Sequence, residues 1–214
     1  VSEAADLISH ARRPLVVGGR GARAAKAELE EFLAASGAVF LDTGECKGVL
    51  ADDHPGLVNA MRATAMGEAD LVITLGRKLD FQLAYGSPAV FSAARWLRIA
   101  DNVAELQDNR RGAVELLASP RLALRALTAA GRGRASSVDR AWRDRLCTGH
   151  AERSAKLAKD MATAGDGSDG RMHPNRLLAG VQRAIGDDAV VVADGGDFLA
   201  FARVGIRCGT YLDP

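Results

Sequence analysis

Three glycine-containing bends carry the residues best suited to chemistry in this sequence, and that chemistry is the binding of phosphate. The first bend, Gly18-Gly-Arg-Gly-Ala22, follows an apolar run and opens a helical pattern. Gly19, Gly21 and Ala24 fit the spacing G-x-G-x-x-A, in which glycine lets the backbone approach a phosphate and the helix amides stabilise its charge. Asp42 ends the next apolar run, where an acid could bind a ribose. The same glycines suit a tight turn that only joins a strand to a helix, and their spacing does not decide between the two.

The second bend, Leu75-Gly-Arg-Lys-Leu-Asp80, also follows an apolar run. We expect its loop to open at the carboxyl edge of a parallel sheet, where open α/β proteins bind their ligands. Arg77 and Lys78 could contact a phosphate there, and Asp80 could accept a hydrogen bond from a ribose or a ring N–H. On spacing alone, a solvated basic turn is the slightly favoured interpretation.

The third bend, Asp194-Gly-Gly-Asp-Phe198, closes a valine-rich run at the start of another helix. Two adjacent glycines suit a backbone that surrounds a diphosphate with its amides. A plain glycine turn is the alternative, and the position directly after Val-Val-Val-Ala favours the diphosphate.

No other stretch predicts a metal site or a catalytic nucleophile. Asp52, Asp53 and His54 are adjacent in one loop, and adjacent loop residues rarely converge on one ion. The sequence shows no Ser/His/Asp or Cys/His set. Three cysteines lie far apart and without metal-ligand spacing, at Cys46, Cys147 and Cys208. Such cysteine usage is typical of a reducing compartment, so we predict a cytoplasmic protein.

Short apolar runs alternate with amphipathic helical segments, and these elements must position the bends. Helical spacing predicts a helix over 22–36, ended by Gly37, and another over 119–130, with Ser119 as its N-cap. Strands are predicted at 14–18, 38–42, 70–75, 96–100 and, with a helical alternative, 114–117. Strands that are apolar on both faces and separated by helices predict a parallel sheet with helices on both sides.

The chain changes character after residue 130. An exposed turn is predicted at 131–137, one long charged helix at 138–164 and a flexible glycine-rich linker at 166–170. A new α/β unit follows, with a helix at 173–185, a strand buried on both sides at 189–193, a helix at 198–204 and a strand at 210–212. About 40 residues with so few elements cannot close a core, so this unit is predicted to be incomplete.

Composition argues against several classes of partner. The 214 residues carry a formal net charge of +1, which gives no reason to expect nucleic-acid binding. No apolar run approaches the ~20 residues that a membrane span needs. The first 15 residues resemble an amphipathic helix and lack the features of a signal peptide. We therefore expect neither nucleic acid nor a membrane as a partner.

Five strings, taken in their order, resemble the thiamine-diphosphate (ThDP)-dependent decarboxylases and carboligases. They are PLVVGGRGA, KGVLADDHPG, ADLVITLGRKLD, AELQDNR and HPNRLLAGVQRAIGDDAVVVADGGDF. GGDFLAFARVG followed by TYLDP is most similar to the acetolactate-synthase-like members. The resemblance implies that residues 1–165 form a central domain, with a Rossmann-like parallel sheet of six strands and helices on both faces. It also implies that 166–170 is a linker and that 171–214 begins the diphosphate-binding domain.

The resemblance implies a nucleotide in the central domain, which is FAD in acetolactate synthases and ADP in oxalyl-CoA decarboxylases. Gly18, Gly19 and Gly21 match the family's glycine turn. Gly76 and Asp80 match its second loop, in which Arg77 and Lys78 also lie.

Two departures from the family pattern argue against FAD. The flavin-binding form of the second loop is G-x-R-x-D-D, and here Lys78 replaces the arginine and Phe81 the second aspartate. Lysine cannot reproduce the two-pronged contact of a guanidinium. An acid of the family's I-D-I-D-P stretch falls on Ala100, although Asp101 is adjacent and stays a candidate.

The third bend is the part that the resemblance connects with ThDP. Gly196, Asp197 and Phe198 align with residues that contact the cofactor's diphosphate in the family, and Gly195 belongs to the same bend. The family's usual pair there is glutamine-histidine, so contact through the backbone is implied. Catalysis in the family also needs Mg²⁺ and a glutamate from a pyrimidine-binding domain, and the motifs for both lie outside this chain. This chain alone is therefore predicted to be inactive.

The intact protein is expected to be a homo-oligomer that decarboxylates a 2-oxo acid such as pyruvate and joins the product to another carbonyl compound. Two other interpretations stay open. One is a stand-alone domain that binds FAD, ADP or CoA, or that serves as a scaffold. The other is a plain Rossmann dehydrogenase, suggested by Gly19, Gly21, Ala24 and Asp42, although no catalytic histidine or substrate domain is visible.

Overall fold

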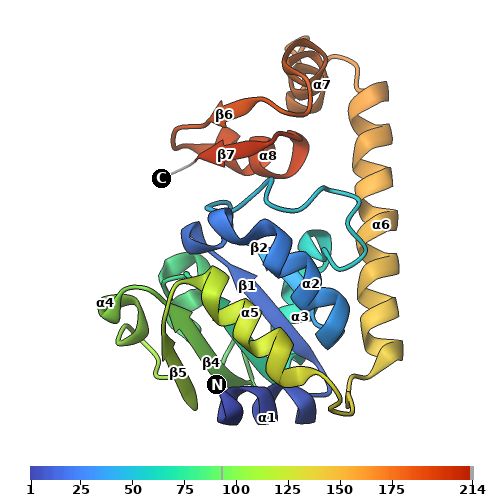
Figure 1. Cartoon of the computed structure of the whole chain (residues 1–214). Helices are drawn as coiled ribbons and strands as arrows, with labels where there is room; N and C mark the ends of the chain where they lie inside the picture. Colours follow the sequence, from blue (N-terminus) through green and yellow to red (C-terminus); the bar gives the residue numbers. More distant parts are fainter. Residues whose placement is uncertain (93, 213–214) are drawn as a thin grey trace.

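A parallel five-stranded sheet lies at the centre of the first part of the chain (Figure 1). A computed structural model describes residues 1–92 and 94–212. Side by side, the strands are β2 (Val39–Asp42), β1 (Pro14–Gly18), β3 (Leu71–Leu75), β4 (Arg95–Ala100) and β5 (Val114–Leu117). The predicted parallel α/β sheet is confirmed, and 114–117 is a strand. The prediction of six strands is wrong, because the sixth strand came from the resemblance alone and the sequence offers five apolar runs of strand type before Pro120.

Helices cover both faces of this sheet (Figure 1). One face carries α1 (Ser2–His10), α2 (Lys26–Ser36) and α5 (Pro120–Gly131). The other face carries η2 (Asn59–Met61), α3 (Arg62–Glu68) and the first half of α6 (Arg140–Thr163). Consecutive strand residues point to opposite faces, so Val16 packs in the first layer and Val17 in the second. The two buried layers, one on each face of the sheet, therefore explain why the strands are apolar on both faces.

Predicted helix ends are confirmed, and one predicted helix begins later than expected. Gly37 ends α2 in the left-handed conformation, with φ of +72°. The Ser119 side chain accepts a hydrogen bond from the Leu122 amide and caps α5. The helix predicted from residue 22 begins instead as a 3₁₀ turn, η1 (Arg20–Ala25), before α2. The first bend is thus followed by a tighter turn than a regular α-helix supplies.

The long charged helix α6 runs beside both parts of the molecule (Figure 1). Asp139 caps its start by accepting from the Trp142 amide. Trp142, Leu146 and His150 are its buried residues, and Met161 near its end packs against the small C-terminal core. Within residues 1–92 and 94–212, no helix combines the length and the apolar character that crossing a membrane requires.

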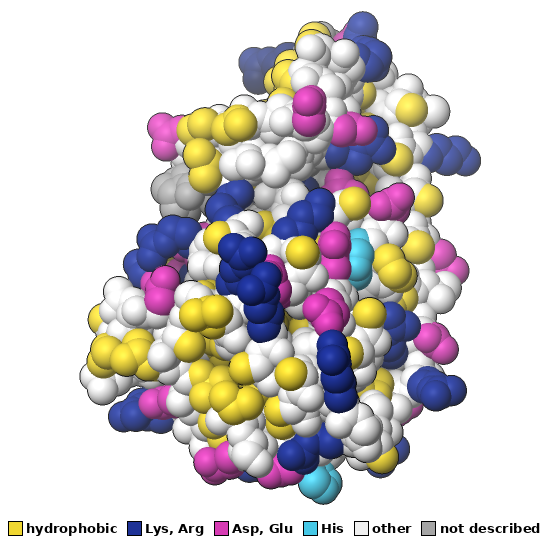
Figure 2. Space-filling view, in the orientation of Figure 1, with side chains coloured by type: hydrophobic (Ala, Val, Ile, Leu, Met, Phe, Trp, Pro, Cys, Tyr) yellow, Lys and Arg dark blue, Asp and Glu magenta, His cyan; other side chains and the backbone are white. Residues whose placement is uncertain are grey.

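The C-terminal unit consists of α7 (Pro174–Ile185), β6 (Val190–Val192), α8 (Asp197–Gly205) and β7 (Thr210–Leu212). Strands β6 and β7 pair in parallel. The expectation that the valine-rich strand is buried on both sides is wrong: Val190 and Val192 are 67% and 76% exposed. Val191 alone of the three faces the small core around Tyr211, because this two-stranded sheet packs there through one face only. Figure 2 shows hydrophobic side chains at the surface in this region.

Candidate cofactor site at the carboxyl edge of the sheet

The first two bends lie side by side because β1 and β3 are neighbouring strands. Gly18 at the end of β1 pairs with Leu75 at the end of β3. The Gly19 amide donates to the Leu75 carbonyl at 3.1 Å, and the Gly21 amide donates to the Gly76 carbonyl at 3.3 Å. The two bends, which are far apart in the sequence, are thus joined through their backbones.

The glycines of these bends are required by this close approach. A Cβ added to Gly19 would lie 2.3 Å from the Gly76 oxygen, and a Cβ added to Gly21 would lie 2.8 Å from the Gly76 Cα. A Cβ on Gly76 would lie 2.5 Å from the Gly21 Cα, and Gly76 has φ of +57°. Real Cβ atoms essentially never approach other heavy atoms so closely, so larger residues here would push the two bends apart.

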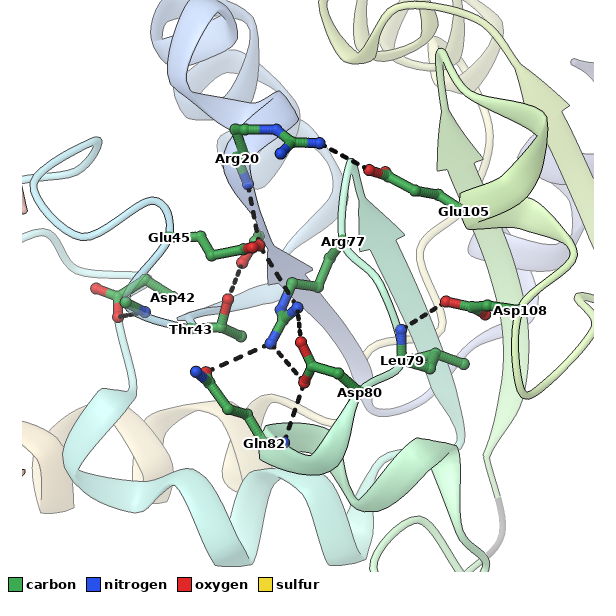
Figure 3. Close-up of polar contacts among 12 residues, drawn as sticks. Arg20, Asp42, Thr43, Glu45, Arg77, Leu79, Asp80, Gln82, Glu105 and Asp108 are labelled. Carbon is green, nitrogen blue, oxygen red and sulfur yellow. Dashed lines mark hydrogen bonds and ion pairs between the residues drawn. The ribbon is translucent and has the colours of Figure 1, made fainter. Parts of the chain in front are cut away.

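Arg77 of the second bend is buried and bound within the protein (Figure 3). Its Nη1 and Nη2 donate to the two oxygens of Asp80 at 2.7 and 2.9 Å. Nη1 also lies 3.5 Å from Glu45 Oε2, and Nη2 lies 3.4 Å from the side-chain oxygen of Gln82. Arg77 and Asp80, two predicted cofactor contacts, are thus brought together and bind each other.

The other predicted cofactor-binding side chains of the central domain are less buried than Arg77. Lys78 and Asp101 are exposed. Asp42, the candidate ribose acid, is instead paired with Asn59: its amide donates to Asn59 Oδ1 at 3.0 Å, and Asn59 Nδ2 donates to its carboxylate at 2.6 Å. The carboxylate of Asp42 therefore already has a partner in the chain.

Sequence reasoning missed a buried arginine, Arg98, that organises this edge. Arg98 is 1% exposed on β4, and its Nε donates to Thr74 on β3 at 2.8 Å. Its Nη1 donates to Asp108 at 2.9 Å, and the other Asp108 oxygen accepts from the Leu79 amide at 2.7 Å (Figure 3). The side chain also reaches the carbonyl of Glu105. A lone charge inside the apolar run Trp-Leu-Arg-Ile-Ala was the available signal, because a buried charge needs polar partners.

Two glutamates that the sequence did not single out also belong to this edge. Glu45 lies after β2, and its Oε2 accepts from the backbone amide of Arg20 at 3.4 Å (Figure 3). Glu105, in α4 (Val103–Leu106), accepts from the side chain of Arg20 at 3.0 Å. No local sequence signal marks either residue, since each acts through a partner distant in the chain.

The third bend lies apart from this cluster, between β6 and α8 (Figure 1). Nothing lies within 4 Å of a Cβ added to Gly195 or Gly196, so the space beside the glycine pair is open, while the Gly195 amide donates to the Asp194 carboxylate at 2.7 Å. Gly196 has φ of +93° and is the N-cap residue of α8. No side chain at this position accepts a hydrogen bond from the helix amides. Asp197 begins the helix, and Phe198 is 42% exposed. An open glycine pair at a helix start is a geometry that admits a diphosphate.

A family model described as "Thiamine pyrophosphate enzyme, central domain" matches residues 1–127. This range contains the whole five-stranded sheet and both of its glycine bends. The chain belongs to the thiamine pyrophosphate enzymes. The resemblance inferred from the ordered strings is therefore confirmed.

Curated members of this thiamine pyrophosphate family show the range of activities among its relatives. An acetolactate synthase large subunit from Mycobacterium tuberculosis (strain ATCC 25618 / H37Rv) is 30% identical over 207 residues, or 94% of this chain and 36% of the relative. A 2-hydroxyacyl-CoA lyase 1 from Dictyostelium discoideum is 42% identical over 94 residues, or 43% of this chain and 16% of the relative. An oxalyl-CoA decarboxylase from Escherichia coli (strain K12) is 27% identical over 165 residues, or 76% of this chain and 29% of the relative. This chain thus spans 36% or less of each relative's length.

Two buried side chains of the central part of the chain have shifted pKa values. Burial raises the pKa of the Cys46 thiol far above its usual range, and its Sγ would lie 2.7 Å from a Cβ added to Gly18. Burial lowers the pKa of His150, whose Nδ1 accepts from the Ala60 amide at 3.1 Å. Among the residues that the structure describes, no group of three or more His, Cys, Asp or Glu side chains is placed to hold a metal ion.

Proposed function

We propose that the intact protein is a ThDP-dependent enzyme that decarboxylates a 2-oxo acid such as pyruvate and joins the product to a second carbonyl compound. The observation that supports this most is the similarity to an acetolactate synthase large subunit, which extends over 94% of the chain. That similarity spans both α/β units, whereas the family model covers only the first. A cytoplasmic homo-oligomer is part of the same proposal, on the cysteine usage and the resemblance.

The third bend is the part of this chain that would hold the cofactor. When bound, ThDP supplies a ring that accepts the electron pair of the broken carbon–carbon bond. The backbone of Gly195 and Gly196 would lie against its diphosphate, with Asp197 and Phe198 at the first turn of α8. Mg²⁺ would accompany the diphosphate, since this ion usually binds through phosphate oxygens together with carboxylates.

Cofactor binding and turnover by the intact protein test this proposal. With ThDP, Mg²⁺ and pyruvate, we expect ThDP-dependent release of CO₂ and formation of acetolactate, both measurable by mass spectrometry. Gly196→Ala forces an alanine to φ of +93° and places a methyl group on the open backbone, so its Kd for ThDP should rise. A rise of roughly tenfold, about 1.4 kcal/mol, is expected by calorimetry. Gly131→Ala, at the end of α5 and away from the bend, should bind ThDP as the wild type does. The absence of ThDP-dependent turnover and of any ThDP binding would contradict the proposal.

A second candidate is the cleavage of a 2-hydroxyacyl-CoA. It is favoured by the 42% identity with a 2-hydroxyacyl-CoA lyase over 94 residues, which is higher than the identity with the acetolactate synthase. The same intact protein, given ThDP, Mg²⁺ and a 2-hydroxyacyl-CoA, would then release an aldehyde. Aldehyde formation without acetolactate formation from pyruvate would select this candidate over the first.

A further inference from the structure

A nucleotide phosphate at the first bend would need backbone amides that are free to donate. In this chain three consecutive amides of the bend have acceptors within the protein. The amides of Gly19 and Gly21 donate to carbonyls of the second bend, and the amide of Arg20 between them donates to the Glu45 carboxylate (Figure 3). A carboxylate of the chain itself therefore sits at the amide in the middle of the bend.

The glycine surfaces of the bend are also covered. A Cβ added to Gly18 would lie 2.6 Å from the ring of Phe40 and 2.7 Å from the sulfur of Cys46. A Cβ added to Gly19 would lie 2.7 Å from the side-chain Cδ of Arg77. In a phosphate-binding bend, glycine leaves room for the ligand; here the room is filled by the protein's own side chains and by the second bend.

The charges at this edge also disfavour a diphosphate. Arg77, with no exposed side-chain surface, is bound by Asp80 and lies against Glu45. Arg20 is paired with Glu105 at 3.0 Å. Both guanidinium groups therefore already have carboxylate partners within the chain, and a diphosphate would have to compete with these partners.

The end of β4 lacks the acid of the family's I-D-I-D-P stretch. Ala100 occupies that position and is 2% exposed, so it offers no carboxylate. The neighbouring Asp101 is exposed, and the candidate acid of β2, Asp42, is paired with Asn59.

We infer that Glu45 takes the place of a nucleotide phosphate from within the chain, with Arg77 as its buried counter-ion, and that the central domain binds neither FAD nor ADP at its glycine bends. The bends then serve to join β1 to β3. The inference is independent of the proposed reaction, because nucleotide content and thermal stability, and not turnover, measure it.

Nucleotide content of the full-length wild-type protein is the first test. The protein is purified without added nucleotide and denatured, and the supernatant is chromatographed for FAD and ADP. Titration calorimetry then follows the addition of each nucleotide up to millimolar concentration. We expect substoichiometric nucleotide after purification and no saturable heat. One FAD or ADP retained per chain, or a saturable heat with either, would overturn the inference.

A variant that removes the internal carboxylate is the second test. Glu45→Ala leaves the Arg20 amide without its acceptor, while Arg77 keeps both bonds to Asp80. Inorganic pyrophosphate should therefore raise the Tm of this variant saturably, since an anion can replace the lost carboxylate. Glu45→Ser, whose short side chain cannot reach the Arg20 amide, gives the same comparison if the alanine variant does not fold.

The matched control is Glu31→Ala, which removes an exposed carboxylate of α2 that lies 3.6 Å from Arg132. The Tm values of this control and of the wild type should change with pyrophosphate only by the general salt effect that both share. If Glu45→Ala and Glu45→Ser respond no more than Glu31→Ala, the assignment of Glu45 to the phosphate position is wrong.

Discussion

The backbone contact between the two glycine bends makes a quantitative prediction for Gly76→Ala. The added Cβ would lie 2.5 Å from the Gly21 Cα and 2.8 Å from its nitrogen. Alanine at the observed φ of +57° costs about 1–2 kcal/mol, because the left-handed region is unfavourable for a residue with a Cβ. The collision adds about 1–3 kcal/mol, the usual cost of an overpacked site. We therefore expect the free energy of unfolding to fall by about 2–5 kcal/mol.

Three further glycine-to-alanine variants separate the two contributions. Gly21→Ala keeps an ordinary backbone but places its Cβ 2.8 Å from the Gly76 Cα, so it should cost about 1–3 kcal/mol. Gly133→Ala has φ of +78° and nothing within 4 Å, so it should cost about 1–2 kcal/mol. Gly131→Ala, in the last turn of α5 with nothing within 4 Å, should be stabilising by up to about 1 kcal/mol.

Thermal and urea unfolding followed by circular dichroism would measure these differences. For a protein of this size, about 1 kcal/mol corresponds to a Tm change of about 2–4 °C. Gly76→Ala should therefore lower the Tm by roughly 4–20 °C and should be the least stable of the four variants. If Gly76→Ala were as stable as Gly133→Ala, the two bends would not be in contact, and the account of their glycines would be refuted.

Three other side chains give predictions of their own. Arg98→Met leaves the carboxylate of Asp108 without its buried partner and should lower the free energy of unfolding by about 3–5 kcal/mol in urea titrations; a change below about 1 kcal/mol would contradict the buried network. Burial lowers the folded-state pKa of His150 below the usual histidine value of about 6.5. The unfolded chain therefore takes up the proton first, and stability should be lost as the pH falls through about 6.5 towards the folded pKa. His150→Asn, which can still accept from the Ala60 amide, should make this loss smaller in unfolding measurements between pH 7.5 and pH 5.5; an unchanged slope would exclude His150 as its source. Burial raises the pKa of Cys46, so its thiol should resist thiol reagents at neutral pH in the native protein and react after unfolding. Mass spectrometry would count the labelled cysteines in each state. Rapid labelling of Cys46 in the native protein would show that the packing at the strand end opens.

The sequence determined the strands of the central domain, several of its helix ends and its parallel α/β class. Five apolar runs became the five strands, because local hydrophobic periodicity reports how each segment is buried. Gly37 and Ser119 marked the helix ends, because their conformation and their capping bonds involve only neighbouring residues. The ordered motifs also identified the family, which the match over residues 1–127 confirms.

Only the tertiary structure decided what the bends contact. The spacing of Gly19 and Gly21 is the same whether the backbone faces a phosphate or another bend, because glycine permits both. Partners distant in the chain, Glu45 for Arg20 and Thr74 for Arg98, leave no local pattern to read. The exposure of Val190 likewise depends on which layers surround a strand, and a run of valines does not specify those layers. A sequence thus fixes what each segment can form by itself, whereas contacts across space depend on which segments the fold places side by side.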